Sequence, residues 1–158
     1  GDREVAAACA SCLQRREPDV RRAGLEALGI LAIRGDQEVV DALCQLLATE
    51  FDAELRRLSV FVLCRVAEPG DVGTTAVLAR ALLADVSARV RAEAAAALGA
   101  LVDRGDRNAM EALGHGAEQD KHIDVRRAAA RGLEVIAAGG NAEAAAIIAA
   151  RDRGGLGS

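Results

Sequence analysis

The sequence predicts an all-α protein, a right-handed α-solenoid of antiparallel helix pairs with a 35-residue repeat. One observation is that the segment beginning Asp19-Val20-Arg21-Arg22 returns three times, in variant form, at intervals of 35 residues. A second is that a glycine followed by Asp or Asn recurs at the same interval, at Gly35, Gly70, Gly105 and Gly140. A fixed period of this length, held without insertions, indicates stacked repeats that are each one supersecondary unit.

The 158 residues hold about four and a half of these units. We expect a single array over residues 1–152, followed by a loose tail over residues 153–158. The array divides into a half unit and four further units: 2–17, 18–52, 53–87, 88–122 and 123–152. Because residues 2–15 align with the second half of later units, we expect the chain to be a fragment of a longer repeat protein.

The composition favours helices that pack closely. Hydrophobic residues make up 51% of the chain, alanine dominates them, and Phe51 and Phe61 are the only aromatic residues. Alanine has the highest helix propensity, and a core of small side chains buries little area per residue. Stability should therefore depend on helix propensity and on stacking between neighbouring units. The net charge of -4 gives no support to nucleic-acid binding.

The first elements follow from apolar spacing and from turn residues. The half unit should be a helix with a stripe of Val5, Ala8, Cys9, Cys12 and Leu13. The first full unit should contain one helix over 19–34 with its apolar face at Val20, Gly24, Ala27, Leu28 and Leu31, and a second helix over 37–49. We call these helix types A and B. The glycine of each turn should end helix A in the left-handed conformation, and the following Asp or Asn should cap helix B.

The later units repeat this plan with weaker second helices. Thr74 and Thr75 are poor helix formers in the second unit, so its helix B should be less stable. Gly114 and Gly116 cost helix propensity in the third unit, and we expect its helix B to fray near residues 118–121. The fourth unit should end with a helix over 141–152.

The cysteines indicate packing and not chemistry. Cys9, Cys12, Cys44 and Cys64 lie in apolar helical patterns, where a thiol acts as a small buried hydrophobe. No histidine lies near enough in sequence to complete a zinc site with them. Reduced thiols are typical of a cytoplasmic compartment. No apolar run is long enough to span a membrane, and no signal peptide is visible.

The pattern Asp-x-x-Arg-Arg-Ala-x-x-x-Leu-Gly, followed by Gly-Asp, resembles the HEAT-like repeats of the phycobilin-lyase type. The 35-residue unit is a few residues longer than those repeats, and in this respect it is more similar to armadillo repeats. Deoxyhypusine hydroxylase is similar in its helices and binds two irons through His-Glu pairs. Here Glu93 follows Ala92, and no His-Glu pair occurs in the chain. We therefore expect no metal, no cofactor and no catalytic residues.

Arginines recur in register along the first helices and form what we call the arginine ladder: Arg21, Arg22, Arg56, Arg57, Arg91, Arg126 and Arg127. A basic stripe of this kind could bind an acidic peptide or a phosphate. Acids that end the preceding helix B could instead neutralise each arginine, and the negative net charge favours this structural interpretation: Glu17, Glu50, Asp52, Asp85, Glu118 and Asp120.

The predicted function is a non-catalytic scaffold that binds a protein or peptide. The resemblance implies a concave surface lined by helix B, where polar side chains are exposed: Gln37, Asp41, Gln45, Arg80, Arg107, Glu111 and His115. Glu111 and His115 share a helix face, but no further ligand converges on them. The alternative is an enzyme, or an enzyme subunit, of the tetrapyrrole-related lyase type. The uncovered end helices should also permit weak self-association.

Overall fold

The computed structural model describes residues 2–31, 33–103 and 105–154. These ranges contain nine helices and no strand. Their bounds are α1 (Asp2–Cys12), α2 (Pro18–Leu31), α3 (Gln37–Thr49), α4 (Ala53–Val66), α5 (Val72–Ala84), α6 (Ala88–Leu101), α7 (Arg107–Gln119), α8 (Ile123–Ala138) and α9 (Ala142–Gly154). The predicted all-α repeat fold is confirmed.

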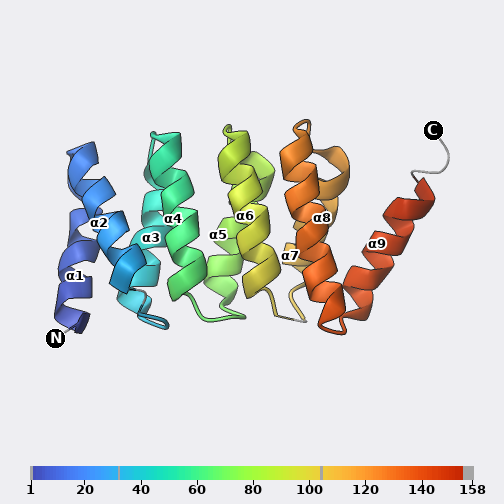
Figure 1. The fold of residues 1–158 in the computed structure, drawn as a ribbon, viewed down its shortest axis with the longest axis horizontal. Helices are drawn as coiled ribbons and strands as arrows, with labels where there is room; N and C mark the ends of the chain where they lie inside the picture. The colour runs from blue at the N-terminus through green and yellow to red at the C-terminus, as the bar shows by residue number, and fades with distance from the viewer. Residues whose placement is uncertain (1, 32, 104, 155–158) are drawn as a thin grey trace. The chain divides into compact units, whose positions relative to one another are not determined.

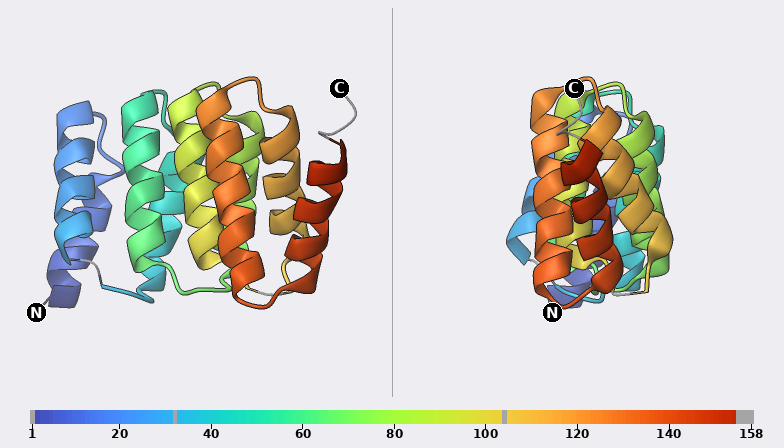
Figure 2. Two further views of the ribbon diagram at one scale, coloured as in Figure 1. Left: turned by 45° about the vertical axis from the view of Figure 1, so that its right-hand side comes forward. Right: turned by 90° about the vertical axis from the view of Figure 1, so that its right-hand side faces the viewer.

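The helices group into two compact units, Gly1–Glu68 with α1 to α4 and Pro69–Ser158 with α5 to α9. In the first unit α2 packs against α1 and α4, and α3 packs against α1 and α4. In the second unit α6 packs against α5 and α8, and α7 packs against α5 and α8. Figure 1 shows α6 and α8 as one layer of the second unit, with α5 and α7 behind them. A second view of the same layers is given in Figure 2.

Each unit has its own core of leucines contributed by every repeat. Leu25, Leu28, Leu43, Leu55 and Leu63 are fully buried in the first unit. The second unit buries a matching set: Leu78, Leu82, Leu98, Leu101, Met110, Leu113 and Leu133. Only aliphatic side chains and one methionine fill these positions, so the helices can approach closely.

The helix bounds follow the sequence pattern with small differences at the ends. Helix α3 spans Gln37–Thr49, as predicted. Helix α2 ends at Leu31, earlier than the expected Arg34. Helix α9 includes Arg153 and Gly154, beyond its expected end.

Three of the turn glycines, Gly35, Gly70 and Gly140, have a left-handed backbone, and two of them also link one repeat to the next. Gly35 has φ +77° and Gly70 has φ +84°, a region that side-chain-bearing residues rarely adopt. The Gly35 N–H donates to Val66 O at 2.8 Å, and the Gly70 N–H donates to Leu101 O at 2.8 Å. The turn therefore reaches the C-terminal end of the following helix A, a tertiary role that the sequence pattern did not show.

The residue after each of these glycines caps a helix B, as predicted. Side-chain oxygens of Asp36, Asp71 and Asp106 accept from backbone N–H groups at 3.4, 2.6 and 3.0 Å, and Asn141 does so at 2.9 Å. Asp106 has a second role, because its other oxygen accepts from the Thr75 hydroxyl at 2.6 Å.

Replacing a cap should destabilise the fold by a modest, defined amount. Asp71→Ala removes the acceptor for the Thr74 N–H and should lower the free energy of unfolding by about 1 kcal/mol. Asp71→Asn is the matched control, because asparagine caps helices as well as aspartate does. Urea unfolding followed by circular dichroism measures both. Equal losses for Ala and Asn would show that the charge, and not the cap, is what matters.

The glycines of α7 permit close packing instead of weakening the helix. Helix α7 continues to Gln119, and both Gly114 and Gly116 are buried. A Cβ at Gly116 would lie 3.1 Å from Leu82 Cδ1, and one at Gly114 would lie 3.1 Å from Ile147 Cγ2. Helix α7 has 13 residues, as α3 and α5 have, so these glycines do not shorten it, and neighbouring helices occupy the space that a side chain would need. The expected fraying near residues 118–121 stays a prediction.

The expected apolar stripe of α1 was also wrong in part. The buried residues are Ala6, Ala10 and Leu13, whereas Val5 and Ala8 are exposed. Helix α1 packs against α2 and α3, and only the face toward them is covered. All four cysteines are thiols and each is half-buried, so they lie at the margin of the core and not within it.

Candidate functional site

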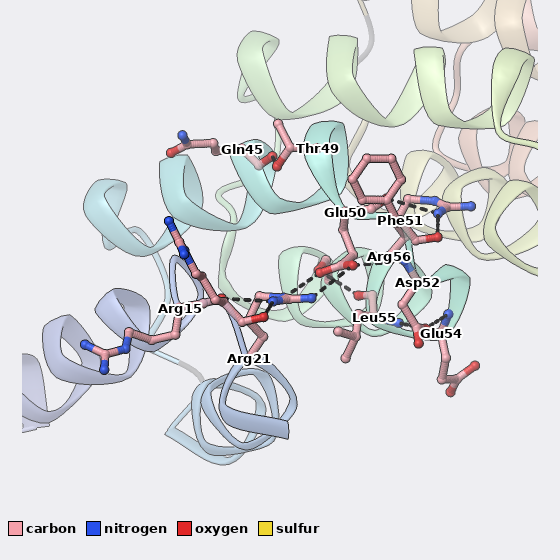
Figure 3. Close-up of polar contacts among 12 residues, drawn as sticks. Arg15, Arg21, Gln45, Thr49, Glu50, Phe51, Asp52, Glu54, Leu55 and Arg56 are labelled. Atoms are coloured by element: carbon pink, nitrogen blue, oxygen red, sulfur yellow. Dashed lines mark hydrogen bonds and ion pairs between the residues drawn. The ribbon is translucent and has the colours of Figure 1, made fainter. Parts of the chain in front are cut away.

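Arg21 of α2 joins the ends of two helices in the first unit (Figure 3). Its Nε donates to Glu50 Oε2 at 2.6 Å, and its Nη2 donates to Glu50 Oε1 at 3.2 Å. Its Nη1 donates to the carbonyl oxygens of Arg15 and Arg16, at 2.9 and 2.7 Å. The guanidinium thus binds a carboxylate with two parallel N–H groups and satisfies two backbone acceptors with a third nitrogen.

Arg91 of α6 repeats this arrangement in the second unit. Its Nε and Nη2 donate to the two carboxylate oxygens of Asp120, at 2.7 and 3.0 Å. Its Nη1 donates to Asp85 O at 2.8 Å and to Val86 O at 3.3 Å. The Arg91 and Asp120 side chains are only 7% and 9% exposed, so this pair is more enclosed than an ordinary surface ion pair.

The structural interpretation of the ladder holds for these arginines, but the expected partners were wrong. We expected each arginine to pair with acids that end the preceding helix B. The structure instead pairs Arg21 and Arg91 with the acid 29 residues later, at the end of the following helix B. At the preceding helix B they donate instead to backbone carbonyls of the residues that follow the helix, which have no partner within a helix that has ended. Arg56 likewise donates to the carbonyls of Glu50 and Phe51.

The second row of the ladder has a different and looser role. Arg57 pairs with Glu54 one turn away on α4, at 2.6 Å, and both side chains are partly exposed. Arg127 is exposed, and Arg22 is partly buried. Asp52, which we had considered as a partner, caps α4 by accepting from the N–H groups of Glu54 and Leu55.

The ladder carboxylates are held ionised. Burial alone would raise the pKa of Glu50, but hydrogen bonds from the Asp52 N–H and from Arg21, with the charge of Arg21, outweigh it and lower the pKa. Burial likewise acts to raise the pKa of Asp120, and the hydrogen bonds from Arg91 and from the His122 N–H lower it overall. Both carboxylates are therefore charged at neutral pH.

Acid should destabilise the protein through these two groups. Their pKa values are lower in the folded chain than in the unfolded chain, so they stabilise the fold fully above their unfolded values, about 4. That stabilisation is lost as the pH falls from about 4 through the lower folded pKa values. Urea unfolding at pH 7, 5, 4 and 3 should show a steep loss below pH 4. The loss should be smaller in Asp120→Asn, and an equally steep loss in that variant would contradict the assignment.

A groove lies beside the Arg21–Glu50 pair, and we call it groove 1. It has a volume of about 360 Å³ and lies between the residues that follow α1 and the C-terminal half of α3. Its lining residues are Leu13, Gln14, Arg15, Arg21, Ala42, Gln45, Leu46, Thr49, Glu50 and Phe51. Figure 3 shows the ring of Phe51 pointing away from the ion pair, while Gln45 and Thr49 share one face of α3.

A second groove, groove 2, is built from the equivalent residues 70 positions later. It has a volume of about 440 Å³ and lies beside the Arg91–Asp120 pair. Every lining residue of groove 1 except Ala42 has its counterpart there, and Leu82 and Val86 complete the set: Leu83, Ala84, Asp85, Arg91, His115, Gly116, Gln119, Asp120 and Lys121. The repeat thus produces the same hollow twice, with different side chains on its walls.

The sequence-predicted binding residues are all exposed, and they are distributed over three helices. Gln37, Asp41 and Gln45 lie on α3, Arg80 on α5, and Arg107, Glu111 and His115 on α7. Gln45 lines groove 1 and His115 lines groove 2.

The remaining predicted residues lie outside the two grooves. Gln37 donates to Asp41 at 2.9 Å, and Arg107 pairs with Glu143 of α9 at 3.1 Å. Glu111 lines a separate shallow hollow, to which Leu83, Asn108, Ala112 and the groove 2 residue His115 also contribute.

Sequence reasoning missed the exposed apolar residues at the groove rims. Phe51 is 98% exposed, and Val86, the equivalent residue of the next repeat, is 87% exposed. Their backbone carbonyls accept from Arg56 and Arg91, which hold the loop in place while the side chain points outward. An apolar residue directly after the helix-ending acid, in register at 51 and 86, was the available signal.

A metal site requires several ligands close together, and a membrane-spanning helix requires a long apolar segment. Across 2–31, 33–103 and 105–154, no three His, Cys, Asp or Glu side chains gather closely enough to hold a metal ion. In the same ranges, no helix is both long and apolar enough to cross a bilayer.

The fold defines a class of protein, an all-α protein built from repeated helix pairs, and here each unit has a groove at the end of a B helix. Residues 1–64 match the sequence profile of HEAT repeats. The match over residues 1–64 and the all-helical architecture both support the predicted resemblance to HEAT-like repeats. HEAT repeats are generally protein-interaction scaffolds and typically not enzymes. No curated protein matches the sequence.

Proposed function

We propose that this chain is a non-catalytic scaffold that binds a polypeptide partner in the grooves at the ends of its B helices. The observation that carries the proposal is the recurrence of one groove in equivalent positions of both units. Each groove combines at least one buried leucine, polar walls that include an arginine–carboxylate pair and one further exposed cation, Arg15 or Lys121, and an exposed apolar rim residue. This combination is typical of surfaces that bind a peptide through one anchoring side chain and several adaptable contacts.

The ladder pair supports binding by making the groove rigid. In groove 1 the Arg21–Glu50 pair fixes the ends of two helices relative to each other, so the groove exists before a partner arrives. The two charges neutralise each other, which leaves Leu13, Leu46 and the rim residue Phe51 to supply apolar contact. A preformed site avoids the entropy cost of ordering loops on binding.

Peptide selection on the intact chain would test the proposal. A random twelve-residue peptide library is displayed and selected against the immobilised protein, and the affinities of the selected peptides are measured by fluorescence anisotropy. Peptides that occupy groove 1 should lose at least about tenfold in affinity with Phe51→Ser, since a buried aromatic anchor contributes about 1.5 to 3 kcal/mol.

The matched control is Ile30→Ser. Ile30 is an 83% exposed apolar residue of the same unit that lies outside groove 1, and its replacement should leave affinity unchanged. A further variant, Gln45→Arg, changes the wall of groove 1. Equal losses of affinity for Phe51→Ser and Ile30→Ser, or no loss of affinity for both Phe51→Ser and Gln45→Arg, would contradict binding in this groove. Saturable binding of a linear tetrapyrrole, followed by its absorption spectrum, would instead favour the lyase alternative.

A further inference from the structure

The two complete ladder sites show what a ladder arginine binds. Arg21 and Arg91 each use Nη1 for backbone carbonyls that lie five and six residues earlier. Each then uses Nε and Nη2 together for one carboxylate, supplied by Glu50 or Asp120. The repeat thus presents the same fork of two N–H donors twice, and both times it takes a carboxylate.

Arg126 of α8 has the first half of this arrangement without the second. Its Nη1 donates to Asp120 O, six residues earlier, at 2.7 Å, as in the other sites. The position 29 residues later is Gly155, which has no carboxylate. Within residues 2–31, 33–103 and 105–154, Arg126 forms no ion pair, so no described acid uses its Nε and Nη2. Arg126 is nonetheless partly buried, and its guanidinium is held in place through Nη1.

Helix α9 leaves this position open. Figures 1 and 2 show α9 leaning away from α8 toward its C-terminal end, whereas α7 runs alongside α8. Because α8 and α9 are antiparallel, the C-terminal end of α9 faces the N-terminal part of α8, where Arg126 lies. In the complete sites the corresponding end of helix B carries the acid.

The charge around Arg126 favours an acidic ligand. Residues 121–131 contain four cations, Lys121, Arg126, Arg127 and Arg131, and one carboxylate, Asp124. This segment is basic although the whole chain has a net charge of -4. Lys121 and Arg127 are both exposed beside Arg126, where they would attract an approaching anion.

We propose that Arg126 is a binding site for an acidic side chain, Asp or Glu, of the polypeptide partner, which takes the place that Glu50 and Asp120 occupy on Arg21 and Arg91. The inference rests on the proposed protein-binding function and adds to it a partner chemistry and a second contact point. Arg126 itself lines neither groove, although its neighbour Lys121 also lines groove 2. The carboxylate accepts from Nε and Nη2 of Arg126, and Lys121 and Arg127 attract it without contacting it directly.

The test follows the arginine Nε–H resonances of the ¹⁵N-labelled chain by nuclear magnetic resonance while hexaglutamate, capped at both ends, is added. The Arg126 Nε–H signal should shift with saturation, and the Arg91 signal should stay in place because Asp120 already occupies it. Arg126→Gln should weaken binding at least tenfold, and Arg126→Lys should also weaken it, because lysine keeps the charge but not the fork.

Arg127→Gln is the matched control, because it removes the same charge from the neighbouring exposed residue. Its effect should be about threefold or less. Equal effects of Arg127→Gln and Arg126→Gln would overturn the proposal in favour of a diffuse basic patch. A larger Arg126 shift with inorganic phosphate or hexathymidylate than with hexaglutamate would overturn the carboxylate assignment. No shift at Arg126 would overturn this inference, while selected peptides that still bind groove 1 would leave the proposed function standing.

Discussion

Gly99→Ala should cost about 3 kcal/mol of unfolding free energy, because helices α6 and α8 cross with their backbones in contact there. A Cβ at Gly99 would lie 2.5 Å from Gly132 Cα and 3.3 Å from Gly132 O. Both atoms belong to the backbone, so no side-chain rotation can relieve the clash, and the two helices must separate. Thermal unfolding and urea titration should both show the loss.

Gly29→Ala is the matched control for this substitution. Gly29 occupies the same position of its repeat, two periods earlier, and a Cβ there would meet only Val62 Cγ2 at 3.5 Å. That distance is an ordinary contact, and alanine is the better helix former by up to about 1 kcal/mol. Gly29→Ala should therefore be neutral or stabilising. A similar loss at both positions would mean that helix α6 does not approach α8 as closely as described.

Arg91→Ala should cost about 3 kcal/mol, the range found when one partner of a buried ion pair is removed. The change leaves the Asp120 carboxylate enclosed without its two donors, and it removes the third nitrogen from the carbonyls of Asp85 and Val86. Arg89→Ala removes an exposed arginine two residues earlier on the same helix and should change stability by less than about 0.5 kcal/mol.

The double variant Arg91→Met with Asp120→Leu separates the two causes of that loss. An apolar pair of similar size needs no ionic partner, so it should recover much of the stability that Arg91→Ala loses. Failure to recover would show that the carbonyl hydrogen bonds, and not the ion pair, hold the helix ends together. Urea unfolding at neutral pH compares these three variants with the unchanged protein.

The grooves show which residues of the candidate site could be predicted from the sequence. Gln45 and His115 were predicted from their place on the exposed face of helix B, and both line a groove. Phe51 was not predicted, because its exposure depends on the loop geometry that Arg56 imposes through the carbonyl of that residue. Exposed apolar residues in loops have no periodic signal, so only the folded chain shows which of them stand beside a hollow.

The arginine ladder shows the same limit for the prediction of ion-pair partners. Its arginines were predicted to be neutralised within the fold, and Arg21 and Arg91 are. The partner could not be chosen from the sequence, because for both of these arginines acids lie just before the arginine and also 29 residues after it. Distance along the chain favoured the nearer acids, but in stacked repeats the end of the next helix B is closer in space.

What the sequence determined by itself was the repeat: helix pairs at a 35-residue interval, capped by Asp or Asn after a glycine turn. These features depend on local physics, namely helix propensity, backbone conformation and capping, which a residue carries wherever it is placed. The tertiary structure alone decided that Gly99, Gly114 and Gly116 admit neighbouring helices and that no acid among the described residues binds Nε and Nη2 of Arg126. Both depend on distances between atoms of different repeats, and those distances exist only once the helices have packed.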